Sequence, residues 1–127
     1  MNPQFTIFGE DNTHKAVTLN GKTTAPGKIT SPTLTGGISV LRFNYTKLFT
    51  DTKLSITVTI TGADGNSVSK DLAVELDKND KYTLYEFEWV LEAPVEGDFT
   101  IEIVNNCPSN NSSSNKDRIS IWYLTWN

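Results

Sequence analysis

Apolar and polar residues alternate along most of this chain, and this pattern restricts the possible folds more than any other feature. Within residues 54–61, Leu, Ile and Val occupy the even positions, and Ser or Thr occupies every odd position. Successive side chains of a β-strand point to opposite faces, so this segment would have one apolar and one polar face. No segment shows the period of an amphipathic helix. The sequence therefore predicts an all-β protein.

The alternating segment runs into a turn and a second strand. Gly62-Ala63-Asp64-Gly65-Asn66 contains the Asp-Gly pair that supplies the positive φ angles of a tight hairpin. Residues 68–76 then place Val and Leu side chains inward, with Lys70 as the exception. This hairpin is the most secure structural prediction.

Similar patterns predict the remaining strands. Eight or nine short strands at this spacing indicate an antiparallel sandwich or barrel within a single domain, residues 1–127. Outside the hairpin, the segments that predict strands are 5–8, 15–19, 28–30, 38–45, 82–91, 99–103 and 119–126.

The final predicted strand has a break in its pattern. Ile119 and Ile121 share one face and Leu124 and Trp126 share another, but the two pairs are out of phase. A β-bulge at residues 122–123 would bring them onto the same face. A strand so rich in β-branched and aromatic residues is expected in the interior of a sheet, or close to it.

Composition excludes several classes of protein. The net charge of −4 and the scattered basic residues argue against a nucleic-acid-binding surface. Cys107 is the only cysteine, so no internal disulfide forms, and we expect a buried, inert thiol. No apolar run approaches the roughly 20 residues that span a bilayer. The N-terminus lacks the charged-then-apolar layout of a signal peptide, which leaves either a cytosolic protein or a mature domain from which the leader is removed. We expect the second, a module of a larger exported protein, monomeric or held within that longer chain.

Several segments resemble a known type of domain. Ser-Pro-Thr-Leu-Thr-Gly-Gly at residues 31–37 and Asn-Lys-Asp-Arg-Ile-Ser-Ile-Trp at residues 115–122, together with residues 41–45 and 97–101, are similar to jelly-roll domains of Bacteroides-type gut bacteria. Those domains in turn resemble the galactose-binding-like sandwich of carbohydrate-binding modules. The resemblance covers residues 28–127 and implies a jelly-roll β-sandwich that is secreted, periplasmic or associated with the outer membrane. It supplies no ligand-binding residues.

Carbohydrate binding requires exposed aromatic rings and planar polar side chains that form directed hydrogen bonds. The expected bulge and the loop before it carry such residues, and Arg42 and Asn44 form a second polar pair on their own strand. The alternatives are that Trp122 covers the core and that Arg118 forms an internal ion pair. The candidate ligand-binding residues are Trp122, Tyr123, Arg118, Asn105 and Asn106.

We expect no cofactor, and a structural calcium ion is the one candidate metal. Many carbohydrate-binding jelly rolls hold calcium through acidic residues of the terminal strand, but here only Asp117 lies near Trp122 and Tyr123. Glu10 and Asp11 are better candidates, because closely spaced carboxylates suit calcium.

Catalytic groups are sparse. His14 is the only histidine and lies in a polar stretch with no nucleophile turn nearby. Glu86 and Glu88 would lie about 7 Å apart on one strand face, a separation found in inverting glycosidases. Alternating Glu is also the ordinary pattern of a solvated face, so we expect no enzyme activity.

These observations favour a non-catalytic carbohydrate-binding module of an exported bacterial protein. The alternative is a structural or protein-interaction domain of a multidomain cell-envelope protein. A binding module should expose at least two aromatic rings in one concave patch, whereas a spacer should bury its Trp and Tyr rings.

Overall fold

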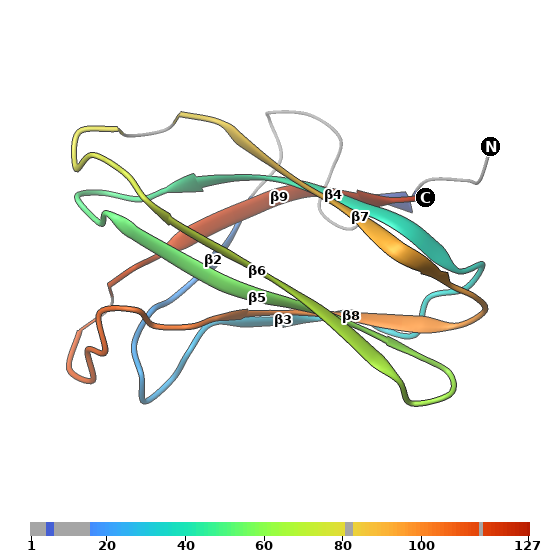
Figure 1. Ribbon diagram of the computed structural model, residues 1–127. Helices are drawn as coiled ribbons and strands as arrows, with labels where there is room; N and C mark the ends of the chain where they lie inside the picture. Colours follow the sequence, from blue (N-terminus) through green and yellow to red (C-terminus); the bar gives the residue numbers. More distant parts are fainter. Residues whose placement is uncertain (1–4, 7–15, 81–82, 115) are drawn as a thin grey trace.

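The chain forms two antiparallel β-sheets that pack face to face (Figure 1). This architecture comes from a computed structural model, which describes residues 5–6, 16–80, 83–114 and 116–127. The described residues contain no helix, and the all-β prediction is confirmed.

Nine strands follow one another along the described part of the chain. The predicted hairpin is confirmed, since β5 and β6 pair along their whole length. Residues 7–8, 15 and 82, which belong to predicted strands, lie outside the described residues. The strands are β1 (Phe5–Thr6), β2 (Val17–Leu19), β3 (Lys28–Thr30), β4 (Ile38–Lys47), β5 (Lys53–Gly62), β6 (Ser67–Glu75), β7 (Tyr85–Val95), β8 (Phe99–Asn105) and β9 (Ile119–Trp126).

The strand order is that of a jelly roll. In the first sheet β9 lies between β4 and the short strands β1 and β2, and β7 forms the far edge beyond β4. The second sheet has the order β3-β8-β5-β6. From β2 onward, every connection except the β5–β6 hairpin passes from one sheet to the other, as in two interlocked Greek keys.

The core lies between the two sheets and is built by alternate residues of the longest strands. Phe43 of β4 stacks on Phe87 of β7 with ring centroids 4.5 Å apart, and Phe99 meets the edge of Trp126 at 6.0 Å. Each fully buried aliphatic or aromatic side chain contributes roughly 1.5–3 kcal/mol relative to exposure. The second sheet contributes a buried row from β5, comprising Leu54, Ile56, Val58 and Ile60.

The predicted bulge in β9 is confirmed. Arg42 of β4 pairs with Thr125 of β9, and Asn44 of β4 pairs with Trp122 of β9. Two steps along β4 therefore correspond to three steps along β9, which is one extra residue in β9. Tyr123 takes a positive φ of +53° there. This extra residue restores the phase of β9, and its four apolar positions are all buried, namely Ile119, Ile121, Leu124 and Trp126.

The strands β6 and β7 are consecutive in the chain and form the exposed edges of the two sheets on one side. Lys70 shares its strand face with Val68 and pairs with the buried Val58, yet both Lys70 and Val68 are exposed. The inward face of β6 therefore extends past the cover of the first sheet. An inward charge on an edge strand opposes edge-to-edge aggregation, which accounts for Lys70 in an otherwise apolar row.

Candidate functional site

The outward face of the first sheet contains a small hollow beside the bulge. Its volume is about 210 Å³, and strands β4, β7 and β9 contribute its lining. The β4 register places Arg42 opposite Thr125, and Asn44 lies opposite Glu86, so these outward positions converge. The lining residues are Arg42, Phe43, Asn44, Glu86, Tyr123 and Thr125.

Tyr123 is the exposed aromatic residue of this hollow. It is 38% exposed and holds a φ of +53°, which is unusual for a bulky residue. A non-glycine residue in this conformation costs on the order of 1 kcal/mol or more, and such strain clusters at sites where a side chain is used. The bulge thus presents the Tyr123 ring to solvent next to polar side chains of β4 and β7.

The polar groups of the hollow are only partly engaged. The Nε atom of Arg42 donates a 2.7 Å hydrogen bond to the Glu88 carboxylate, and this ion pair orients the guanidinium along the face. Within the part of the chain that the structure describes, the side chains of Asn44 and Glu86 make no hydrogen bond. Asn44 therefore offers two amide donors and an acceptor, and Glu86 offers acceptor oxygens.

Two of the residues predicted to bind a ligand are buried. Trp122 is only 7% exposed and lies opposite Asn44 on β4. Asn105 is 1% exposed, and its amide nitrogen donates to the carbonyl oxygens of Leu19 and Asp117. Its side-chain oxygen also accepts the backbone N–H of Cys107, so Asn105 ties three segments together.

Arg118 forms the internal ion pair that the sequence left as an alternative. Its Nε and Nη2 atoms lie 2.7 and 3.2 Å from the two carboxylate oxygens of Asp51, which raises the pKa of Arg118 above its ordinary value. The guanidinium also lies 4.4 Å from the centroid of the exposed Phe49 ring. The Arg118 side chain therefore fastens the β4–β5 connection to the start of β9.

Asn106 belongs to the opposite face of the sandwich. Its amide donates to Ser55, and its oxygen accepts a hydrogen bond from Thr57, both on the outward face of β5. The predicted residues are thus distributed over two faces and the interior, and only Tyr123 lines the hollow. A ligand-binding role for the other four stays a prediction. The sequence did single out Arg42 and Asn44 as a pair, but nothing in it indicated that they lie beside Tyr123.

The candidate metal ligands Glu10 and Asp11 lie outside the described residues, as does His14. Among the residues that are described, no group of three or more His, Cys, Asp or Glu side chains could hold a metal ion. Asp64 accepts the backbone N–H of Asn66 within its hairpin turn.

The Cys107 thiol is buried as expected. Burial, and to a lesser degree the charge of Asp117, raises its pKa, which keeps the thiol protonated and unreactive.

Across the described ranges, no helix is long and apolar enough to cross a membrane.

Comparison with known proteins gives the fold and little else. No family model and no curated protein matches the sequence. Chains in the structures of infectious bursal disease virus, Gt and Gx strains, are similar, with TM-scores of 0.54 and 0.55 at 15% and 13% identity. They match 98% of this chain, which spans 32% and 31% of theirs.

A third similar structure is that of Arthrobacter globiformis T6 isomalto-dextranase complexed with panose. Its TM-score is 0.49 at 16% identity, covering 97% of this chain and 20% of that chain. This chain therefore spans a third or less of the length of each of these three chains. At such identities the shared feature is the β-sandwich fold, and no matching family supports the finer resemblance to Bacteroides-type or galactose-binding-like domains.

Proposed function

We propose that this β-sandwich is a non-catalytic carbohydrate-binding module and that its ligand occupies the hollow beside Tyr123. The observation that carries the proposal is the exposed Tyr123 ring beside Asn44 and Glu86, whose side chains make no hydrogen bond among the described residues. The exposed Phe49 has the same φ of +53° and lies outside the hollow, so strain alone does not mark a site; the proposal rests on the Tyr123 ring lying beside polar side chains.

The chemistry of the hollow suits a sugar. The Tyr123 ring supplies an apolar surface for the C–H face of a pyranose, and its hydroxyl can also donate or accept a hydrogen bond. Asn44 and Glu86 provide directed partners for hydroxyl groups, and Arg42 adds a charged donor. Because no large apolar surface lines the hollow, recognition would rest on these few contacts.

The size of the hollow argues for weak binding of a single sugar residue. Its volume of about 210 Å³ lies below the range of about 300–1,000 Å³ that is usual for drug-sized ligands. It also exposes one aromatic ring, whereas we expected two or more in a binding patch. We therefore infer a dissociation constant near the millimolar range, about −4 kcal/mol of binding free energy.

Weak binding at one site is compatible with a role as a module. Attachment to a larger assembly raises the effective concentration of each site and increases avidity without new contacts. We propose an exported bacterial parent protein in which this domain holds glycan, following the family resemblance of residues 28–127. Burial of Trp122 is what a plain spacer would show, whereas the exposed Tyr123 ring beside polar side chains favours binding.

A glycan array followed by calorimetric titration of the best ligand tests the proposal. Tyr123→Ala should weaken binding about tenfold or more, because the stacking surface is lost. Phe49→Ala is the matched control: Phe49 is also exposed, at 55%, and also has a φ of +53°, but it lies against Arg118, away from the hollow. This control should bind as the parent does.

Two outcomes would contradict the proposal. One is the absence of any glycan binding at millimolar concentrations; the other is equal loss of binding in both variants. Chromatography of the bound glycan after long incubation provides a further check, since release of shorter products would show catalysis. In that case Glu86→Gln and Glu88→Gln would identify the carboxylates responsible.

A further inference from the structure

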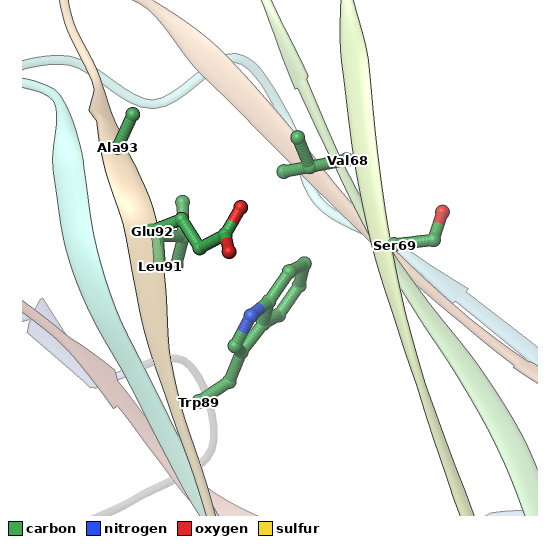
Figure 2. Close-up of a pocket in the computed structure, with 6 residues that line it drawn as sticks. All are labelled: Val68, Ser69, Trp89, Leu91, Glu92 and Ala93. Atoms are coloured by element: carbon green, nitrogen blue, oxygen red, sulfur yellow. The ribbon is translucent and has the colours of Figure 1, made fainter.

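A larger groove runs between the two edge strands, β6 and β7. Figure 2 shows its central part, where the Trp89 indole and the Glu92 carboxylate extend from β7 toward β6 and the Val68 side chain points back at them. This part has a volume of about 400 Å³. A second hollow of about 610 Å³ shares Val68 and Ala93 with it and continues to the β5–β6 turn.

The groove combines an apolar floor with free strand edges. Trp89 and Leu91 form the floor on the β7 side, and Val68, which is 44% exposed, faces them from β6. Among the described residues, β6 pairs only with β5 and β7 pairs only with β4. Alternate backbone N–H and C=O groups of β6, and of β7 up to Val90, therefore point away from any partner strand, as in surfaces that accept an added strand. Beyond Val90 the register of β7 against β4 shifts, and Pro94 has no N–H to donate.

The charged side chains that line this floor are acidic, although the exposed Lys70 follows Val68 on the same face of β6. Glu92 lines the central part, and Asp64 and Glu96 line the continuation. No Lys or Arg side chain lines either part, among the residues that the structure describes. The outward row of β7 adds Glu86, and also Glu88, which is already paired with Arg42. An occupant should therefore carry positive charge.

We propose that this groove binds an extended, basic segment of a protein partner, which adds a strand along β7. In such a pairing, alternate side chains of the partner meet the inward row of β7 and should be apolar to cover Trp89 and Leu91. The intervening side chains meet the outward row and should be Lys or Arg, to pair with Glu92 and its neighbours. The proposed ligand thus alternates basic and apolar residues.

A second copy of this chain is a poor occupant. Two β7 strands paired edge to edge would place Glu side chains against Glu side chains, and like charges directly opposite each other destabilise a strand pair. Pairing β7 with β6 of another copy would bring Asp71 and Glu75 to the same row of carboxylates. The net charge of −4 opposes both arrangements. The charge pattern thus favours a different, basic partner.

This groove is a site separate from the hollow of the proposed glycan-binding function. The hollow lies on the outward face of the first sheet, whereas the groove opens between the sheet edges. Glu86 borders the hollow as well as the β7 edge. Glu92 and Glu96 border the groove and not the hollow beside Tyr123, so substitutions at these two positions test the peptide site separately from the glycan site.

Fluorescence polarisation with a labelled peptide tests the proposal. The probe is the peptide Lys-Val-Arg-Leu-Lys-Thr-Arg-Val. One control peptide, the acidic twin, has Glu in place of each basic residue, and a second control peptide has the same composition with the basic residues grouped at one end. The probe should bind at least about tenfold more tightly than either control peptide. Raising the salt concentration should weaken its binding, because the charges are solvent-exposed.

Substitutions in the chain locate the site. Glu92→Lys combined with Glu96→Lys should weaken the basic probe about tenfold or more and leave glycan binding unchanged. The matched control is Glu75→Lys combined with Glu102→Lys, which changes the charge equally on the outward face of the second sheet. It should change peptide affinity less than about twofold.

Amide chemical shifts and hydrogen exchange distinguish strand addition from nonspecific electrostatic attraction between the peptide and the acidic surface. The basic probe should shift and protect amides of β7 and of residues 67–69, and leave the centre of β4 unchanged. Failure to bind at about 1 mM peptide, equal binding of the acidic twin, equal effects of both double variants, or shifts confined to another surface would each overturn the proposal. Self-association of the chain without peptide, measured by sedimentation, would overturn it in favour of a second copy.

Discussion

The two outward faces of the sandwich differ in the hydrogen bonds that their polar side chains form. On the second sheet, Thr59 and Thr61 of β5 share hydrogen bonds with the hydroxyl groups directly opposite them on β6, at 2.9 and 2.7 Å, and Thr57 bonds to Asp71 at 2.8 Å. On the first sheet, the side chains of Asn44 and Glu86 make no such bonds within the described ranges.

This difference indicates that the two faces have different roles, one in stability and one in binding. Side chains that pair across strands have used their hydrogen-bonding capacity to stabilise the sheet. Among the described residues, Asn44 and Glu86 beside Tyr123 retain theirs, whereas Arg42 pairs with Glu88, and the backbone at Tyr123 has a positive φ. The regular face of β5 and β6 is expected to contribute to stability, and the irregular face around β9 to contribute to binding.

The largest expected effect comes from removing the hydroxyl pairs. The triple variant Thr57→Ala, Thr59→Ala and Thr61→Ala should lose about 2 kcal/mol of unfolding free energy, from the lost cross-strand pairs and the lower strand propensity of Ala. The double variant Asn44→Ala and Glu86→Ala should stay within about 0.5 kcal/mol of the parent. Urea denaturation measures both, and equal losses would remove the distinction between the faces.

A glycine substitution sharpens the same comparison. Tyr123→Gly relieves the strained φ while it removes the ring contacts, so its unfolding free energy should stay within about 0.5 kcal/mol of the parent. Thr59→Gly, in ordinary strand conformation, should lose about 1 kcal/mol or more. If both glycine variants were destabilised alike in thermal and urea unfolding, the backbone at Tyr123 would not be strained.

The smallest effect is expected at the ion pair of the irregular face. Arg42 and Glu88 are both partly exposed, so Glu88→Gln should lower the unfolding free energy by no more than about 0.5 kcal/mol. That difference should vanish in about 1 M salt, where charges are screened within about 3 Å. A larger or salt-independent loss of unfolding free energy would mean that the ion pair holds the residues lining the hollow in position.

Local pattern was enough to predict much of the fold. The β5–β6 hairpin follows from strict alternation and an Asp-Gly turn, and the β9 bulge follows from the phase change between Ile121 and Leu124. Lys70 interrupts the inward row because β6 is an edge strand, and edge position depends on the order of strands in the sheet. Lys47 shows the same limit: it is fully buried, with its ammonium group donating to the carbonyl oxygens of Phe49 and Lys78.

The candidate site was less predictable because its parts come from distant segments. Tyr123 meets Arg42 and Asn44 only through the register of β9 against β4, which alternation alone does not define. Sequence proximity instead grouped Tyr123 with Arg118, whose partner Asp51 belongs to the β4–β5 connection. The adjacent residues Asn105 and Asn106 show the same point, since one is buried and the other lies on the surface.

The position of β9 between β2 and β4 also has a consequence for biosynthesis. A ribosome delivers β2, β4 and β7 long before β9, so the nascent first sheet lacks the strand that joins its two halves. Until residues 119–126 emerge, β2 has no neighbour and one edge of β4 is open to other chains. We therefore expect this domain to complete its folding late and slowly, and to depend on chaperones that shield nascent strands.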